Sequence, residues 1–395
     1  MAFMVNGSIK GNFHEGKTNE KGFWSKKDRV SVKNTHFAIK HRFFCTFQPM
    51  KKLFIALPLL FLFGCAEAPI PTENPSPKST YLDYSNRDDK LSGGVKMIPI
   101  QTESGTFNVW TKRVGNNPTM KVLLLHGGPG VTHEYLESFD SYLPNAGIEY
   151  YYYDQLDSHY SDQPNDSNLW SVDRYVDEVE QVRKALGLNQ DNFYLYGSSW
   201  GGILCMEYAL KHQENLKGLI ISNMMASIPE YNAYAHDVLG KQLDPGVLAE
   251  LESMEANEDF ANPRYIELIE QHYYPEHLLR MPLEEWPEPV TRSFSHTNAD
   301  LYVTMQGPSE FGIAGNARLL PWDVKDKLKN ISIPVLSIGG THDTMDPKHM
   351  EWIANEVQDG QYLHCLNGSH LSMYDDAEIY FEGLIKFVED VDARP

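Results

Sequence analysis

One short stretch of the chain, FYLYGSSWGG at 193–202, has the residue types of a serine nucleophile and its support. If a strand turns there at once into a helix, Gly197 and Gly201 remove the Cβ atoms that would collide in the bend. Ser199, at the tip, then projects above the sheet at a helix N-terminus, where developing negative charge is favoured. This G-x-S-x-G pattern predicts a nucleophile elbow, and the alternative is an ordinary Gly-Ser turn.

Two further features could stabilise the negative charge that forms when a serine attacks a carbonyl. The loop HGGPG at 126–130 follows an earlier apolar run, and its glycines let backbone N–H groups turn toward a ligand. A plain turn is the alternative for this loop. Trp200 can offer its backbone N–H while its ring packs or lines the pocket. Ser198 is the competing hydroxyl, but it is not the central residue of the pattern.

A serine nucleophile needs a base, and the base needs an orienting acid. Behind a nucleophile elbow, the expected chain order is serine, then an acid, then histidine. Asp343 follows the apolar run 333–340, and His370 follows the run 361–366. Both residues therefore lie at the C-terminal ends of predicted strands, where open α/β sheets build their sites. We expect Asp343 and His370 to complete a catalytic triad.

Three other residues compete with this assignment. Asp346 and His342 lie close to Asp343 in the chain. Asp346 directly precedes Pro347, a predicted helix start, and is better explained as a helix N-cap. His126 begins the glycine loop, but it precedes the serine and so breaks the expected order.

The elements that must position these residues are apolar strands that alternate with helical patterns. Strands are predicted at 120–125, 148–155, 193–197, 216–222, 333–340 and 361–366, and helices at 171–186 and 201–211. Strands that are apolar on both faces and alternate with helices indicate a mostly parallel sheet with helices on both of its faces.

The strand pattern breaks between about 228 and 320. That segment is rich in Glu, Pro and Tyr and has helix-like patches without a clear strand. We therefore expect a core in two parts, 85–227 and 321–395, with a helical cap over 228–320 inserted between them.

Composition and charge narrow the possible partners. The chain has 395 residues, of which 42% are hydrophobic and 12% aromatic, as in globular proteins. Its formal charge of −20 at pH 7 argues against nucleic acid as a partner. The Cys and His spacing is not of a metal-binding type, so no metal or cofactor is expected. Cys205 and Cys365 lie in apolar stretches and are predicted to be buried free thiols.

The segment 50–65, MKKLFIALPLLFLFGC, is typical of a secretory signal, with two lysines before a short apolar run. The small residue and cysteine at its end resemble a bacterial lipobox, which predicts lipidation of Cys65. The alternatives are a buried helix or an uncleaved anchor. This interpretation places the protein in the bacterial cell envelope, attached to a membrane by lipid and facing outside the cytoplasm.

Two other segments complete this interpretation of the N-terminal region. Residues 66–84 are rich in Pro and Ser and are predicted to form a flexible tether. Residues 1–49 are basic, unlike the acidic remainder, and precede the signal-like segment. We expect Met50 to be the true start and 1–49 to be an over-extended gene start.

With these residues identified, the chain resembles the α/β-hydrolase fold, and more closely the proline iminopeptidases and the tricorn-interacting aminopeptidase. The similarity covers about 95–392 and rests on motifs in the same order: HGGPG, YYDQL, LWSVDRYVDEVEQVRKALGL, GSSWGG, GPSEF and a GxxD…GSH pair. The resemblance implies a helical cap and a triad of Ser199, Asp343 and His370. It also implies oxyanion donors at Gly128 and Trp200 and substrate contact at Gly127.

In this family, carboxylates of the cap bind the free α-amine of the substrate, since a buried ammonium without a counter-charge is costly. Glu310 in GPSEF matches one such acid. Many members have a second acid directly after the triad aspartate, where this chain has Thr344. The segment DQLDSHYSDQP at 154–164 also departs from the Gly-Cys-Gly-Ser-like turn of relatives.

The expected activity is that of a serine aminopeptidase, which releases an N-terminal residue, with proline as a candidate, from short peptides through an acyl-enzyme. One alternative is an esterase or amidase for a small acyl substrate. Another is a lipid-tethered binding protein with a vestigial site, against which the intact set of site residues argues. A serine rather than an aspartate at the elbow argues against an epoxide hydrolase or dehalogenase.

Overall fold

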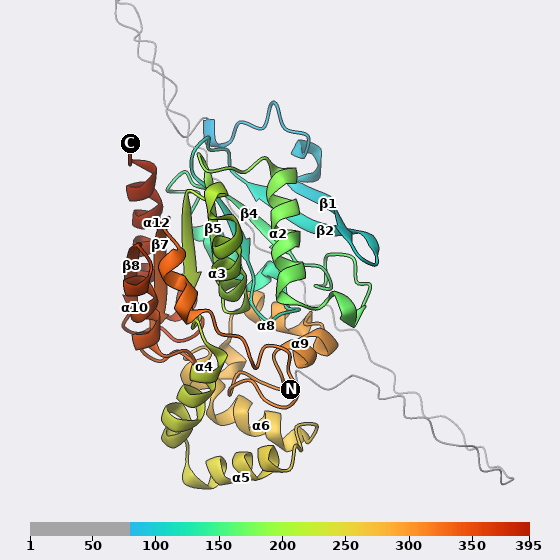
Figure 1. Ribbon diagram of the computed structural model, residues 1–395, viewed down its shortest axis with the longest axis vertical. Coiled ribbons are helices and arrows are strands. Elements are labelled where there is room, and N and C mark those ends of the chain that lie inside the picture. Colours follow the sequence, from blue (N-terminus) through green and yellow to red (C-terminus); the bar gives the residue numbers. More distant parts are fainter. Residues whose placement is uncertain (1–79) are drawn as a thin grey trace, which may run out of the picture. The chain divides into compact units, whose positions relative to one another are not determined.

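Eight strands of the computed structural model, which describes residues 80–395, form one mixed sheet (Figure 1). Their order is β1-β2-β4-β3-β5-β6-β7-β8. The pairs β1–β2 and β2–β4 are antiparallel, and all other neighbouring pairs are parallel. The strands are β1 (Val95–Thr102), β2 (Gly105–Val114), β3 (Lys121–Leu125), β4 (Glu149–Asp154), β5 (Phe193–Ser198), β6 (Gly218–Ser222), β7 (Pro334–Gly340) and β8 (Asp359–Cys365).

Alternate residues of the central strands face two separate apolar cores. In β5, for example, Phe193 and Leu195 belong to one core, and Tyr194 and Tyr196 belong to the other. This period of two is the pleat of a strand that is buried on both faces. The predicted mostly parallel sheet is therefore confirmed.

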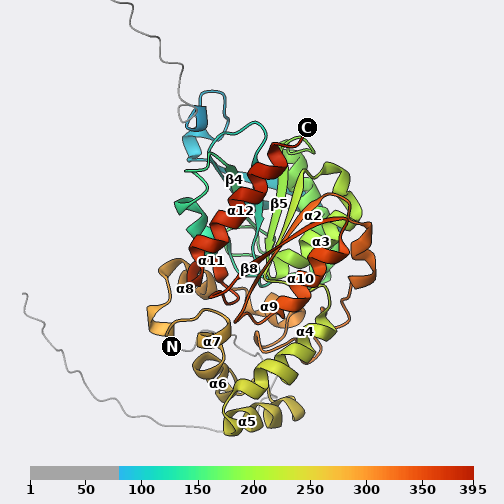
Figure 2. The ribbon, with the colours of Figure 1, turned by 90° about the vertical axis from the view of Figure 1, so that its left-hand side faces the viewer.

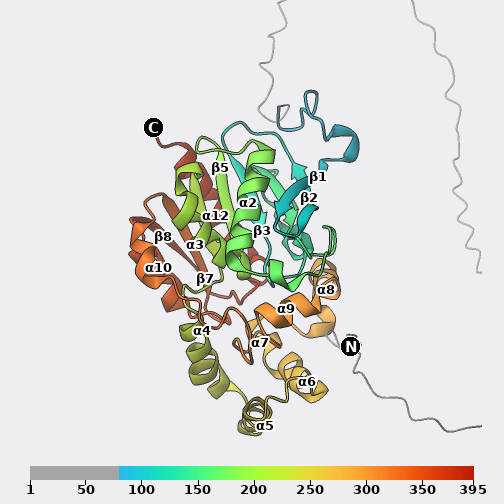
Figure 3. The same cartoon turned by 45° about the vertical axis from the view of Figure 1, so that its right-hand side comes forward.

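Helices cover both faces of the sheet. One core includes residues of α2 (Val172–Leu186), α3 (Trp200–His212) and α10 (Pro347–Glu356). The other includes residues of the 3-10 segment η2 (His133–Ser141) and of α12 (Ala377–Asp392). Figure 2 shows α12 across the second face, and Figure 3 shows α2 and α3 on the first.

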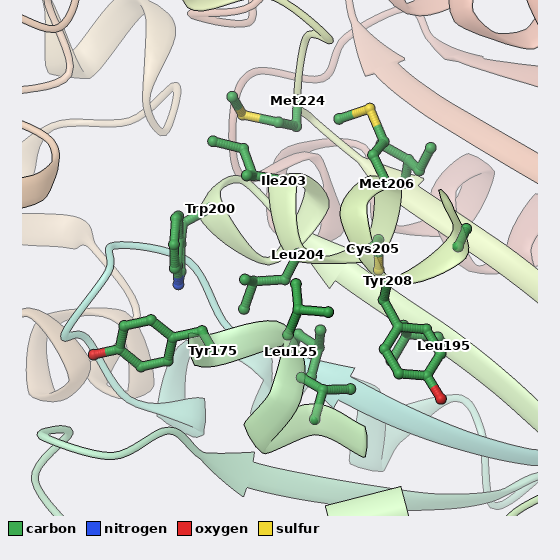
Figure 4. Close-up of a cluster of buried hydrophobic side chains, with 14 of the residues drawn as sticks. Leu125, Tyr175, Leu195, Trp200, Ile203, Leu204, Cys205, Met206, Tyr208 and Met224 are labelled. Atoms are coloured by element: carbon green, nitrogen blue, oxygen red, sulfur yellow. The ribbon is translucent and has the colours of Figure 1, made fainter. Parts of the chain in front are cut away.

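The core beneath α3 holds the nucleophile segment in place. Figure 4 shows Trp200, Ile203 and Leu204 of α3 among side chains of neighbouring elements. The rings of Trp200 and Tyr175 meet edge to face, with centroids 5.6 Å apart. All four side chains are almost completely buried, so the start of α3 is fixed by packing on both sides.

The helical segments between β6 and β7 form the cap, which lies at the lower end of the sheet in Figure 1. They have a core of their own, built around Leu251, Leu268, Tyr273 and Phe311. The α-helices are α4 (Ile228–Tyr234), α5 (Pro245–Ala256), α6 (Pro263–His272), α7 (Tyr274–His277), α8 (Glu288–Ser295) and α9 (Ala299–Met305).

The structure adds a β-hairpin, β1 with β2, that the sequence analysis did not predict. Its strands are mostly half-buried or exposed, so they lack the continuous apolar run that marked the central strands. Cys205 and Cys365 are buried and free, as expected.

Cys65, where lipidation is predicted, the signal-like segment 50–65 and the segment 1–49 lie outside the described residues, as do residues 66–79 of the predicted tether. Within 80–395, no helix is both long and apolar enough to cross a membrane.

Candidate active site

Ser199 occupies a sharp bend between β5 and α3. Its backbone has φ 55° and ψ −122°, a conformation that is rare outside glycine. A Cβ on Gly197 would lie 2.0 Å from the carbonyl oxygen of Gly201, and one on Gly201 would lie 2.4 Å from that of Leu125. Both glycines are therefore required by close backbone approach. The unusual backbone conformation of Ser199 is of a kind typical of functional positions and costs on the order of 1–3 kcal/mol.

His370 and Asp343 form a buried pair that can serve this serine. The Nδ1 atom of His370 lies 2.8 Å from Oδ1 of Asp343, and both side chains are almost inaccessible to solvent. Burial lowers the pKa of His370, but the charge of Asp343, the hydrogen bond to it and the charge of Glu310 outweigh burial. The pKa of His370 therefore lies above its usual value.

The loop of His370 is tied to the cap. The backbone N–H groups of His370 and Leu371 donate to the carbonyl oxygens of His277 and Leu278, each over 3.0 Å. The position of the base thus depends on the end of α7, which belongs to the cap.

One cavity brings the predicted residues together. Ser199, His370, Gly127, Gly128 and Glu310 all line it. The remaining lining residues are Val131, Tyr135, Ser198, Leu278, Phe294, Tyr302 and Leu371. Asp343 stands behind His370 and does not line the cavity, as its orienting role requires.

The backbone beside the serine offers two free donors. Within residues 80–395, the N–H groups of Gly128 and Trp200 have no acceptor. Gly128 has φ 103°, and Trp200 is the first residue of α3. Both features suit an oxyanion hole made of a glycine loop and a helix N-terminus.

Gly127 is engaged differently from Gly128. Its N–H donates to the hydroxyl of Tyr135 over 2.8 Å, so that group does not face the substrate. A Cβ on Gly127 would lie 3.0 Å from Cβ of Ser199. Gly127 therefore contributes to the cavity by having no side chain.

The ring of Trp200 packs and does not line the cavity. Its Nε1 donates to Oε1 of Gln155 over 2.8 Å, and Gln155 in turn donates to the carbonyl oxygen of His126 over 3.2 Å. These bonds connect the start of α3 with the glycine loop. The largest side chain of the GSSWGG segment therefore fixes the two oxyanion elements relative to each other.

Glu310 lines the cavity and has one carboxylate oxygen without a partner among the described residues. It lies in the loop after α9 and is only 7% exposed. Its Oε1 accepts a hydrogen bond of 2.5 Å from the Tyr302 hydroxyl, whereas Oε2 has no partner among the described residues. Burial raises the pKa of Glu310 above its usual value, although His370 and Tyr302 act in the opposite direction. Such a carboxylate is suited to a cationic group of a ligand.

Thr344 lies behind the cavity. Its hydroxyl lies 2.9 Å from Nδ1 of His370 and 3.4 Å from Oδ1 of Asp343, and it lines neither of the two cavities around Glu310. Its position is therefore suited to contact with the histidine–aspartate pair, not to substrate binding.

Two of the three competing residues, Asp346 and His126, have structural roles. Asp346 caps α10, since its side chain accepts from the N–H of Lys348, as expected. His126 is fully buried between the carbonyl of Gly127 and the N–H of Gln155.

Sequence reasoning missed two residues of the site. Tyr135 binds the glycine loop, and Asn223 binds Asp343 through its Nδ2 at 2.6 Å. Asn223 directly follows β6, so the rule that selected Asp343 and His370 could have found it. Tyr135 carried no comparable signal, because only the fold brings it to Gly127.

Comparison with known proteins agrees with this geometry. The family model described as "alpha/beta hydrolase fold" matches residues 121–248. The proline iminopeptidase of Elizabethkingia meningoseptica is 57% identical over 298 residues, covering 75% of this chain and 99% of that protein. That of Flavobacterium johnsoniae is 57% identical over 295 residues, covering 75% and 98%. The chain belongs to the proline iminopeptidase family.

A solved structure of the family gives the same result. The crystal structure of the proline iminopeptidase of Mycobacterium smegmatis matches with a TM-score of 0.67 at 27% identity, covering 75% of this chain and 98% of that one. Membership in this family makes the chain an α/β hydrolase. The described part of this member of the family contains no cluster of three or more His, Cys, Asp or Glu residues that could hold a metal ion.

Proposed function

We propose that this protein is a serine aminopeptidase that releases N-terminal proline from short peptides with a free N-terminus. One observation carries the proposal: Glu310, which has a carboxylate oxygen without a partner among the described residues, lines the same cavity as Ser199 and His370. A carboxylate beside the nucleophile can bind the α-ammonium of the residue whose carbonyl is attacked. The family relatives support proline as that residue.

The proposed reaction begins with attack of Ser199 Oγ on the carbonyl carbon of the first residue. His370 accepts the serine proton at Nε2, since its Nδ1 is directed toward Asp343. The N–H groups of Gly128 and Trp200 stabilise the oxyanion. His370 then gives the proton to the leaving amine, and an acyl-enzyme remains. A water molecule, deprotonated by His370, hydrolyses that ester and restores Ser199.

The lining of the cavity supports a small, apolar first residue. Besides its polar groups, the wall consists of Val131, Leu278, Phe294 and Leu371.

An acylated N-terminus would bring no positive charge, and Glu310 would remain buried and unpaired. We therefore propose an exopeptidase and not an endopeptidase.

The test is a panel of substrates for the wild-type protein. We expect prolyl-β-naphthylamide to be cleaved, N-acetylprolyl-β-naphthylamide to be cleaved at least 100-fold more slowly (~3 kcal/mol for an unpaired buried charge), and labelling by a fluorophosphonate to block cleavage. Equal rates on the free and the acetylated substrate would favour the esterase or amidase alternative.

We also propose that the enzyme is exported and held on a membrane by a lipid on Cys65, with short peptides outside the cytoplasm as substrates. The signal-like segment 50–65 supports this proposal. Cys65→Ala is expected to move the enzyme from the membrane fraction to a soluble fraction or to stop its processing. A variant that stays membrane-bound at the processed wild-type size would contradict it.

A further inference from the structure

The side-chain amide of Asn223 connects the two loops that carry the acid and the base. Its Nδ2 donates to Oδ2 of Asp343 over 2.6 Å and to the carbonyl oxygen of Ser369 over 3.1 Å. Oγ of Ser372 lies 3.3 Å from the same nitrogen. Ser369 directly precedes His370, so one buried amide spans both partners of Ser199.

The backbone of Asn223 is suited to this position. Its φ of 53° lies in the left-handed region, which asparagine, aspartate and glycine tolerate better than other residues. Its N–H donates to the carbonyl oxygen of Ile338 in β7 over 2.9 Å. The side chain therefore starts from a fixed point between the ends of β6 and β7.

The other end of the amide belongs to a buried chain of hydroxyl groups. Oδ1 of Asn223 accepts from Ser222 Oγ over 2.6 Å, Ser222 lies 2.8 Å from the Tyr380 hydroxyl, and Tyr380 lies 2.7 Å from the Tyr196 hydroxyl. All of these residues are 0% exposed.

The carboxylate of Asp343 fixes which group donates and which accepts in each of these hydrogen bonds. An ionised carboxylate can only accept, so the amide must donate to Asp343 and its oxygen must accept from Ser222. Ser222 then has no second proton, so Tyr380 must donate to Ser222, and Tyr196 must donate to Tyr380. Each dipole points the same way, which strengthens the donation to Asp343.

We infer that Asn223 is a positioning residue for the catalytic pair, an inference that rests on the proposed roles of Asp343 and His370. By binding Oδ2, Asn223 leaves Oδ1 of Asp343 directed at Nδ1 of His370. By binding the carbonyl of Ser369, it sets the distance between the two loops. Without this amide, Oδ1 of Asp343 would keep the N–H of Met345 and the Thr344 hydroxyl as donors, whereas Oδ2 would lose its one donor among the described residues.

The pH dependence of the Asp343–His370 pair is affected by the charged groups near it. Besides the two partners, Glu310 of the cap acts on both, and His277 of α7 and Asp375 of α11 (Ser372–Asp375) are within reach of Asp343. The phenol and thiol groups near Asp343 have pKa values raised by burial and stay neutral: Tyr234, Tyr273, Tyr362 and Cys365.

Asn223→Gly and Asn223→Asp test the inference, because both residues accept the left-handed backbone. We expect Asn223→Gly to lower kcat by about 10- to 100-fold, with KM within about twofold, since the base is less well oriented for both chemical steps. In Asn223→Asp, two carboxyl groups face each other over the short distance now spanned by the amide and share a proton, so the pH profile of kcat/KM should gain the titration of this pair. Asn165→Gly is the matched control, because Asn165 also has a left-handed backbone, with φ 52°, and its hydrogen bonds go to neither Asp343 nor His370. It should change kcat by less than about threefold.

Labelling of Ser199 by a fluorophosphonate separates this inference from the proposed function. If wild-type protein is labelled but does not cleave prolyl substrates, the aminopeptidase proposal fails, and the labelling rates of the variants still test Asn223. Wild-type labelling rates in Asn223→Gly, together with an unchanged pH profile in Asn223→Asp, would overturn the inference. If Asn223→Gly does not fold, the pH profile of Asn223→Asp decides alone.

Discussion

At the scale of single residues, the proposed reaction requires Ser199 as the nucleophile. Ser199→Ala should lower kcat by a factor on the order of 10⁶, because the covalent route is removed while the fold needs no side chain there. Rates on prolyl-β-naphthylamide and thermal unfolding of the same preparation check this. Ser198→Ala is the matched control, since Ser198 also lines the cavity but lies at the end of β5. A large loss only in Ser198→Ala would assign the role to that hydroxyl.

The protonation of His370 gives a second prediction at this scale. His370 must be neutral to accept the serine proton, so activity is lost as pH falls through its pKa. Because that pKa is raised above 6.5, the acid limb of kcat/KM should have its midpoint above pH 6.5. Glu310 contributes to this rise, so Glu310→Gln should move the limb to lower pH.

An ester substrate without an amine is the suitable probe for this profile, since only the enzyme then titrates in the range. A midpoint below pH 6.5 in the wild type, or a limb that Glu310→Gln moves to higher pH, would contradict the assigned electrostatics.

The sequence could predict the triad because each proposed member lies within four residues of the end of a predicted strand. Ser199 needed one further constraint, the two glycines that keep Cβ atoms out of the bend. Asn223 satisfied the same strand-end rule, but an asparagine carries no chemistry of its own, and only the fold shows that its amide binds Asp343. Tyr135 is eight residues from Gly127 in the chain, and no pattern links them.

At the scale of elements, the central strands were predictable because both of their faces are apolar. The hairpin of β1 and β2 was not, because its residues are only partly buried. The cap helices were expected only as a group. Several of them are short, and α5 and α6 begin at prolines behind the N-cap residues Asp244 and Asn262. Which cap residues face the cavity depends on packing that their sequence pattern does not specify.

The contact of α8 with η2 positions the cap over the core and gives a prediction at this scale. Arg292 of α8 forms ion pairs with Glu134 and Glu137 of η2, and His296 lies 2.8 Å from Glu134. η2 begins three residues after the glycine loop ends, and the cap carries Glu310. Arg292→Ala should therefore lower kcat/KM for prolyl substrates by about tenfold, because small misplacements of binding groups reduce rates strongly.

Arg264→Ala is the control for this variant. Arg264 pairs with Glu250 and Glu267 inside the cap and has no ion pair with the core among the described residues. Equal effects of the two variants on kcat/KM would indicate that the contact between α8 and η2 does not position the cap.

At the scale of the whole molecule, the active site exists only where cap and core meet. The core supplies Ser199, His370 and the oxyanion donors, and the cap supplies Glu310 with its partner Tyr302. The chain is acidic overall, with a net charge of −20, so a peptide with a positive N-terminus is attracted toward it. Net charge acts on every positively charged peptide alike. The buried carboxylate of Glu310 is therefore the group proposed to select a free amine.

The most direct test of the account compares Glu310→Gln with wild type on two substrates. For prolyl-β-naphthylamide, kcat/KM should fall by about 30- to 1000-fold, the range of 2–4 kcal/mol for loss of one partner of a desolvated charge pair. For a p-nitrophenyl ester without an amine, measured on the pH plateau, it should change by less than about threefold. Glu285→Gln, an exposed glutamate of the cap, should leave both values unchanged. Equal losses on the two substrates in Glu310→Gln would contradict an amine-binding role and with it the aminopeptidase assignment.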